Sequence, residues 1–214
     1  IGEGSLGGKA RGLAFMNSMI LKHRLYDKHA NVRIMIPRSV VIATDYFDDF
    51  IRLNGLKYII SQEFSDEEIL SEFVSSTVPA RLQQELKAYI QTVRTPLAVR
   101  SSSKLEDSHY QPFAGIYSTY MIPYVDNGDQ MLRLLLKAVK SVYASVYFAT
   151  SRAYLSSSQN LISEEKMAVI IQEVCGTEQD GLFFPTFSGV ARSINYYPIG
   201  DEAPADGVCN IAMG

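Results

Sequence analysis

Apolar residues at helical spacing predict two long helices in this chain. In residues 9–24, apolar side chains recur at intervals of three or four residues, which is the period of one helix face: Leu13, Met16, Met19 and Ile20. A longer apolar stripe runs through residues 128–154, and it consists of Met131, Leu134, Leu135, Ala138, Val142, Val146 and Ala149. The serines at positions 156–158 are expected to end this second helix.

Residues typical of helix starts predict three shorter helices. Their expected ranges are about 44–53, 66–76 and 79–93. Thr44 or Asp45 is expected to cap the first of them, because a short polar side chain can accept a hydrogen bond from the first helical turn. Ser65 and Glu68 have the spacing of a capping box. Pro79 suits a first helical turn, where its missing N–H group is not needed.

Apolar and β-branched runs predict the strands. They are expected after Pro37 within residues 34–43, and at 97–101, 116–122, 166–174, 181–185, 188–194 and 207–213. Residues 116–122 suit an antiparallel neighbour of 97–101. The run at 166–174 is apolar at almost every position, which is typical of a central strand. Helices and strands mix without a regular βαβ repeat, so the pattern predicts the α+β class.

Composition narrows the function classes. The chain has 214 residues, 47% hydrophobic and 20% charged, which is typical of globular proteins. The net charge of −3 speaks against a general nucleic-acid binder, and no apolar run approaches the roughly 20 residues of a membrane span. Cys175 and Cys209 belong to no metal-binding pattern, so we expect buried free thiols and a cytoplasmic protein. The first residue is Ile1 and the last residues are apolar, so we expect a piece of a longer protein.

The glycine-rich segment GSLGGKARG, residues 4–12, is the first candidate for an anion site. Glycines let a backbone approach a phosphate closely, and the start of a helix directs N–H groups at an anion. Lys9 would add a mobile positive charge. The segment is not a Walker A motif, because Ala10 stands where that motif requires Ser or Thr. The alternative is a flexible glycine loop.

The stretch LAVRSSSKLED, residues 97–107, is the second candidate. A short apolar strand ends in Arg100, Ser101 and Ser102, which offer a planar fork of donors and two hydroxyl groups to a polyphosphate. Glu106 and Asp107 follow and could hold magnesium. The alternative is a strand followed by a solvated polar loop. No role is assigned to His109 in the same loop.

Two further segments are candidates only in combination with the others. The buried strand that emerges into Gln172, Glu173 and Val174 is suited to the edge of adenine, which takes one backbone donor and one backbone acceptor. The alternative is a core strand with a polar exit. Arg192 follows Ser188–Gly189–Val190–Ala191 near a strand end, where the alternative is a surface ion pair.

Taken in chain order, these segments resemble one family. They are GGKARGLAFM near the start, P-x-x-VVIAT-x-x-F at 37–47, LAVRSSS-x-x-ED…FAG-x-Y-x-TY at 97–120, MAVIIQEV at 167–174, SGVARS at 188–193 and NIAMG at 210–214. Together they are similar to the nucleotide-binding domain of phosphoenolpyruvate synthase and pyruvate phosphate dikinase. The segment with VRSS, ED and FAG is the most specific of them.

The resemblance implies an ATP-grasp fold, in which ATP lies between two α+β lobes, here approximately 1–122 and 123–214. It implies ATP and Mg²⁺ as cofactors. Lys9 and Arg100 would contact phosphates with catalytic effect, Ser101 and Ser102 would complete the phosphate site, and Gln172 to Val174 would hold adenine. In the family, a phosphoryl group passes to a histidine on a separate domain and then to pyruvate on a third. Those two domains would be partners within the same parent chain.

Two departures from the family pattern leave alternatives open. The family strand after SGV usually continues with an aromatic residue and a threonine, whereas this chain has Ala191–Arg192–Ser193. The family's GLGE segment, which supplies a metal-binding acid, would begin where this chain ends at Gly214, so the fold is expected to be truncated and the metal ligands are unassigned. The alternatives are a dikinase with another acceptor, or a regulatory module that binds nucleotide without transfer.

Overall fold

The computed structural model describes residues 1–60, 62–103, 115–157 and 165–214, and these form two compact units. The first unit comprises Ile1–Val174 and the second Cys175–Gly214. The helices are α1 (Gly7–Lys22), α2 (Thr44–Leu53), α3 (Asp66–Ser75), α4 (Ala80–Ile90), α5 (Gly128–Ala144) and α6 (Ala149–Ser157). The strands are β1 (Ser39–Ile42), β2 (Leu97–Ser103), β3 (Thr119–Ile122), β4 (Met167–Glu173), β5 (Thr177–Gln179), β6 (Leu182–Phe184), β7 (Phe187–Arg192) and β8 (Val208–Met213).

A four-stranded antiparallel sheet of order β1-β4-β2-β3 organises the first unit. Strand β4 is central, as its continuous apolar sequence predicts, and β3 is the antiparallel neighbour of β2 as expected. In the register between β2 and β4, Arg100 lies opposite Ile170 and Ala98 opposite Gln172. Directly opposite residues point to the same face of a sheet, so these side chains share one face.

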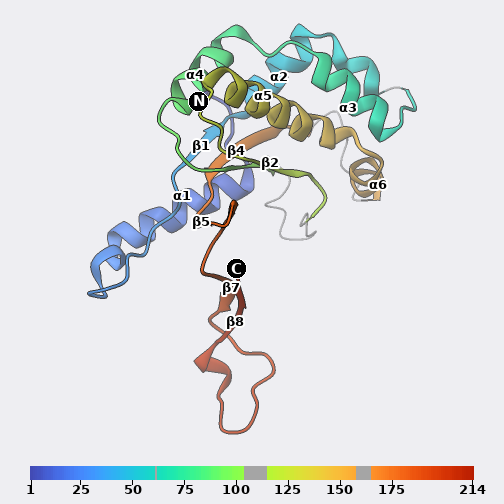
Figure 1. Cartoon of the computed structure of the whole chain (residues 1–214). Helices are drawn as coiled ribbons and strands as arrows, with labels where there is room; N and C mark the ends of the chain where they lie inside the picture. Colours follow the sequence, from blue (N-terminus) through green and yellow to red (C-terminus); the bar gives the residue numbers. More distant parts are fainter. Residues whose placement is uncertain (61, 104–114, 158–164) are drawn as a thin grey trace. The chain divides into compact units, whose positions relative to one another are not determined.

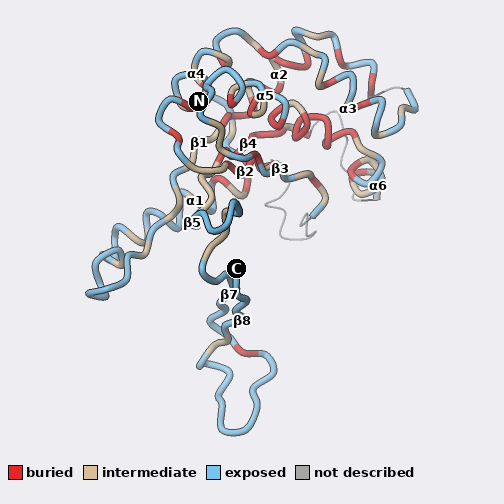
Figure 2. Tube along the Cα trace, viewed as in Figure 1, coloured by how far each residue is buried: buried red, intermediate tan, exposed pale blue. Residues whose placement is uncertain are grey.

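The core of the first unit lies between the sheet and the helices α2 to α5, which cover one face of it (Figure 1). Figure 2 shows the buried residues concentrated where these helices meet the sheet. Phe50, Phe73 and Tyr143 are fully buried there, with ring centroids 5.5–5.7 Å apart in the pairs that share Phe50. Helix α1 covers the opposite face, where its first turn contacts the end of β2 (Figure 1).

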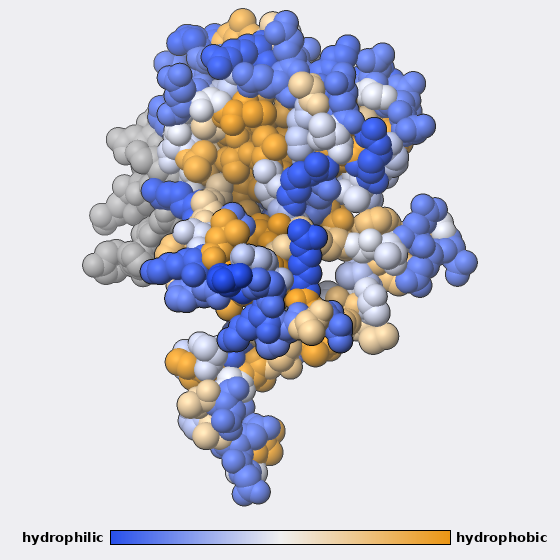
Figure 3. Space-filling model, turned by 90° about the vertical axis from the view of Figure 1, so that its left-hand side faces the viewer, coloured by the Kyte–Doolittle hydropathy of each residue, from blue (hydrophilic) through white to orange (hydrophobic). Residues whose placement is uncertain are grey.

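The second unit consists of two hairpins, β5–β6 and β7–β8, each with antiparallel pairing. Every residue of β7 is exposed, and among the residues described in this unit only Asn195 is buried. Apolar patches reach the surface of the protein (Figure 3), and the exposed large side chains include Phe15 and Leu21 on α1 and Tyr197 and Ile199 between β7 and β8.

Two expectations differ from the structure. The helix expected over 128–154 is interrupted, because Ser145–Tyr147 form a 3-10 turn and Phe148 is extended. Both cysteines are exposed rather than buried, since Cys175 lies two residues after the end of β4 and Cys209 lies in an exposed hairpin strand. The boundary between the two compact units falls after Val174, because α5 and β4 pack with residues 1–122. The lobes expected around a nucleotide, 1–122 and 123–214, stay a prediction.

No helix among the described residues is long and apolar enough to cross a membrane.

Candidate functional site

The glycine-rich loop before α1 is tied to the start of α2. The Asp45 carboxylate accepts hydrogen bonds from the N–H groups of Glu3 and Gly4, both at 3.0 Å. Burial would raise the pKa of Asp45, but these backbone donors outweigh it and lower the pKa below its ordinary value. Thr44 Oγ1 accepts from the N–H group of Ser5 at 2.9 Å. The loop therefore has a defined path across the N-terminal end of α2.

The expected capping role of Thr44 and Asp45 is thus wrong in detail. The N-cap of α2 is Ala43, and no side chain caps it. Both polar side chains lie in the first turn, and they serve the glycine loop about forty residues earlier in the chain. The sequence contains the residues of a helix start, but the structure uses their acceptors for a long-range contact.

A second set of contacts fixes the loop to the end of β2. The buried Ser102 hydroxyl donates to Leu6 O at 2.8 Å and accepts from Ala10 N–H at 3.1 Å. Gly7 has φ +70°, and a Cβ on it would lie 1.9 Å from Ser102 O. A side chain cannot fit there, so the glycine allows the close approach of two backbones. These contacts set the position of the first turn of α1.

The side chains of Lys9 and Arg100 both make hydrogen bonds along β2 and β4. Lys9 Nζ donates to Ser101 Oγ at 3.1 Å, although 92 residues separate them, and Arg100 Nη1 donates to Gln172 Oε1 at 3.1 Å. The structure therefore gathers five of the predicted site residues, namely Lys9, Arg100, Ser101, Ser102 and Gln172. Arg100 and Gln172 are each half-buried.

The backbone donors of the glycine loop are mostly used within the protein. Asp45, Thr44 and the side chain of Ser5 engage the N–H groups of residues 3, 4, 5 and 7. In the first turn of α1, Gly8 N–H has no partner among the described residues. The loop therefore leaves fewer backbone N–H groups for an anion than the sequence suggests.

The other end of the site is the exit of β4. Glu173 N–H donates to Arg38 O and Val174 N–H donates to Pro96 O, both at 2.9 Å. The carbonyl oxygens of Glu173 and Val174 accept no hydrogen bond from the described residues. For Val174 the reason is chemical: its partner Pro96 has no N–H group to return. The exit of β4 thus offers two acceptors, while its N–H donors are taken.

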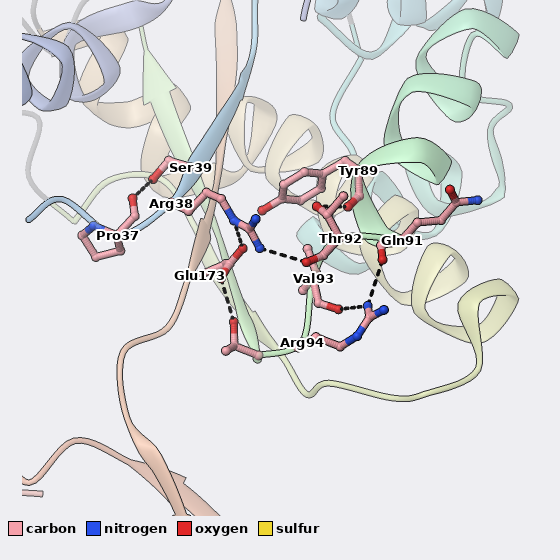
Figure 4. Close-up of polar contacts among 10 residues, drawn as sticks. Pro37, Arg38, Ser39, Tyr89, Gln91, Thr92, Val93, Arg94 and Glu173 are labelled. Atoms are coloured by element: carbon pink, nitrogen blue, oxygen red, sulfur yellow. Dashed lines mark hydrogen bonds and ion pairs between the residues drawn. The ribbon is translucent and has the colours of Figure 1, made fainter.

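The Glu173 side chain faces the protein itself. Its carboxylate pairs with Arg38 Nε at 2.5 Å and accepts from Thr95 Oγ1 at 3.4 Å, as Figure 4 shows for Arg38. Glu173 therefore fits the expected adenine site through its carbonyl group rather than through its carboxylate. No sequence signal pointed to Arg38, which lies 135 residues from its partner.

The remaining candidates lie outside the described residues or in the second unit. Glu106, Asp107 and His109 lie outside the described residues. Arg192 is the last residue of β7 in the second unit, where it is exposed. Among the residues that the structure describes, no three His, Cys, Asp or Glu side chains are placed to hold a metal ion, so no magnesium ligand is assigned.

Comparison with known proteins gives a consistent set of relatives. The family model described as "Pyruvate phosphate dikinase, AMP/ATP-binding domain" matches residues 3–213. The chain is 29% identical over 152 residues to an uncharacterized phosphotransferase, YvkC, of Bacillus subtilis (strain 168), which covers 70% of this chain and 17% of the relative.

Two further proteins are similar over comparable lengths. Phosphoenolpyruvate synthase of Aeropyrum pernix is 24% identical over 200 residues, 84% of this chain and 22% of that protein. A probable phosphoenolpyruvate synthase of Staphylothermus marinus is 25% identical over 175 residues, 71% of this chain and 20% of that protein. The chain thus matches about a fifth of the length of each of these three relatives.

Proposed function

The chain belongs to the family of pyruvate phosphate dikinase AMP/ATP-binding domains, and from this membership we propose that Mg²⁺-ATP binds at the end of β2 and the exit of β4. Lys9 and Arg100 contact the phosphates, with Ser101 and Ser102 around them. The adenine ring lies at Gln172 to Val174. One observation carries the proposal: Lys9 bonds to Ser101 beside Arg100, and Arg100 bonds to Gln172 near the exit of β4.

The register of the sheet supports this placement. Arg100 lies opposite Ile170, and Val174 lies four residues beyond Ile170 on the same chain. At about 3.4 Å per residue, the phosphate end and the base end are about 14 Å apart along the strand. An extended nucleotide suits that separation, with its charged end at the two basic residues and its base at the apolar strand end.

The chemistry of these residues suits phosphoryl transfer. Such transfer needs positioning and neutralisation of charge more than covalent help from the protein. Arg100 supplies a planar fork to phosphate oxygens, while Lys9 supplies a mobile point charge from the first turn of α1. Because Ser102 and Gly7 fix that turn, the ammonium group is held near the phosphates before the nucleotide arrives.

For the whole protein we propose phosphotransferase activity of the phosphoenolpyruvate synthase type. ATP is cleaved to AMP, the β-phosphoryl group passes to a histidine nitrogen on another domain, and pyruvate then receives it. The terminal phosphoryl group is transferred either to water, which releases phosphate, or to inorganic phosphate, which releases pyrophosphate. The similarity to phosphoenolpyruvate synthases favours pyruvate as the acceptor, while a different acceptor and a module without transfer are the alternatives.

The nucleotide site is tested by calorimetric titration of the full-length protein with Mg²⁺-ATP. Loss of one charged partner at a desolvated site costs about 2–5 kcal/mol, so Lys9→Ala and Arg100→Ala should each weaken binding about 30-fold or more. The matched controls are Lys22→Ala, in the last turn of α1, and Arg52→Ala, which pairs with Asp49 on the surface. Equal affinity of wild type and both site variants would refute the assignment.

The reaction is tested with ATP labelled in the β-phosphate. The proposal expects acid-labile label on the protein and release of that label as phosphoenolpyruvate when pyruvate is added. Label that stays on the protein with pyruvate present identifies another acceptor. Binding of Mg²⁺-ATP without any labelling identifies the regulatory alternative.

A further inference from the structure

Arg38 joins three segments at the exit of β4. It precedes β1, and its Nε donates to Glu173 Oε1 at 2.5 Å, while its Nη2 donates to Thr92 O at 2.9 Å. Figure 4 shows the guanidinium group between the end of β4 and the turn that follows α4. The fork of donors on arginine allows this double contact in one plane.

The backbone of Glu173 is held by the same residue as its side chain. Glu173 N–H donates to Arg38 O, so Arg38 holds Glu173 through both its carbonyl oxygen and its guanidinium group. Thr95 Oγ1 approaches the other carboxylate oxygen of Glu173 at 3.4 Å. The direction of the peptide groups after Glu173 is therefore set by Arg38, which precedes β1.

We propose that Arg38 is a positioning residue for base recognition, because it fixes the direction in which the Glu173 and Val174 carbonyl oxygens point. This inference rests on the proposed nucleotide site. Either carbonyl oxygen suits the 6-amino group of adenine, which donates a hydrogen bond. The 6-oxo group of hypoxanthine cannot donate, so the same carbonyl groups disfavour it.

The exposure of the ion pair separates this role from a structural one. The Arg38 side chain is 54% exposed and that of Glu173 16%. Ion pairs with an exposed partner contribute about 0–1 kcal/mol to stability, so the first unit should stay folded without this one. Loss of Arg38 should act locally, on the end of β4.

The experiment compares three ligands on the full-length protein: Mg²⁺-ATP, Mg²⁺-ITP and inorganic tripolyphosphate. In Arg38→Gln, affinity for ATP should fall about 3- to 10-fold, the equivalent of one hydrogen bond. Affinity for ITP and for tripolyphosphate should not change, so the preference for ATP over ITP falls by the same factor as the affinity for ATP. Arg52→Gln is the matched control, because Arg52 forms an exposed ion pair with Asp49 within α2.

A second variant tests the route of the effect. Glu173→Gln should reduce the ATP-to-ITP ratio as Arg38→Gln does, and the double variant should lose no more than either single one, because both act through one contact. Additive losses, or an unchanged ATP-to-ITP ratio in Arg38→Gln, would overturn the inference. An equal fall for ATP and tripolyphosphate would also overturn it, because that pattern indicates general destabilisation.

The result for Lys9→Ala separates this inference from the proposed function. If Lys9→Ala weakens the binding of tripolyphosphate while Arg38→Gln leaves the ratio of ATP to ITP affinity unchanged, the nucleotide site stands. Only the proposed role of Arg38 is then refuted. If Lys9→Ala changes neither ATP nor tripolyphosphate binding, both proposals fall.

Discussion

Gly7 lies so close to Ser102 that a Cβ on the glycine would be 1.9 Å from the Ser102 carbonyl oxygen. Gly7→Ala must therefore move the glycine loop away from β2, and the φ of +70° adds strain. We expect a loss of about 2 kcal/mol or more in the free energy of unfolding, measured by urea denaturation. We also expect weaker Mg²⁺-ATP binding, because Lys9 moves with the loop.

Gly12→Ala is the matched control for this change. Gly12 lies inside α1, and a Cβ on it meets nothing within 4 Å. Alanine there should raise the free energy of unfolding by about 0.5–1 kcal/mol through helix propensity. If Gly7→Ala were as well tolerated as Gly12→Ala, the close contact between the loop and β2 would be wrong.

Asp45→Asn should destabilise the protein at neutral pH and much less in acid. Hydrogen bonds from Glu3 and Gly4 lower the pKa of Asp45 in the folded state against the opposing effect of burial. The stabilisation is therefore complete above the unfolded pKa of about 4, and it is lost as the pH falls through the lower folded value. Urea unfolding at pH 7 and at pH 3 should show a difference between wild type and variant that shrinks in acid.

Asp49→Asn controls for general charge effects in the same helix. Asp49 pairs with Arg52 on the surface of α2 and does not contact the glycine loop. A pH dependence that is the same for Asp45→Asn and Asp49→Asn would contradict the anchoring role of Asp45.

Ser102→Ala should affect both stability and nucleotide binding. The change leaves Leu6 O and Ala10 N–H without their partner, which costs about 1–3 kcal/mol when such groups are buried. Because the same contact holds the turn that carries Lys9, Mg²⁺-ATP affinity should fall as well. Ser75→Ala removes a hydrogen bond from a hydroxyl group at an exposed helix end and should change neither stability nor nucleotide affinity.

Tyr89→Phe should be tolerated at pH 7 and should protect the protein in alkali. The Tyr89 hydroxyl is buried without a hydrogen-bond partner among the described residues, so its removal costs little. Burial and the nearby Glu173 raise the pKa of Tyr89 to about 12. A raised pKa stabilises the folded state below pH 10, and this contribution is lost as the pH rises from 10 to 12.

Urea unfolding between pH 7 and pH 11.5 checks the Tyr89 prediction. The wild type should lose stability relative to Tyr89→Phe above pH 10. Tyr197→Phe, at a side chain that is 87% exposed, should follow the wild type throughout. Parallel curves for wild type and Tyr89→Phe would show that the hydroxyl titrates as it does in the unfolded chain.

Local signals predicted most elements of the fold. The capping box of Ser65 and Glu68 is confirmed, with both reciprocal hydrogen bonds present. The central position of β4 followed from an apolar run, because a strand covered on both faces needs apolar residues at every position. The break between α5 and α6 was missed, since the apolar stripe continues across Ser145–Tyr147.

Local signals did not predict contacts between residues that are far apart in the sequence. Asp45 carries a strong helix-start signal, and nothing in its neighbourhood indicates the loop that it binds. Arg38 and Glu173 are ordinary polar residues in their own segments, and only the register of β1 against β4 brings them together. For Lys9 and Arg100 the order of motifs along the chain led to the prediction of a shared phosphate site, because a family resemblance supplies tertiary information that spacing lacks; that site stays a prediction.

The strand order β1-β4-β2-β3 has a consequence for the protein as it is made on the ribosome. The two strands made first, β1 and β2, do not pair with each other; β4, the last strand of the first unit, inserts between them. A nascent chain that ends before β4 can hold the glycine loop at Thr44 and Asp45, but it has no continuous sheet. Pairing over such sequence distances is slow. ATP should therefore bind and protect the emerging chain from proteolysis only after Val174 has left the exit tunnel.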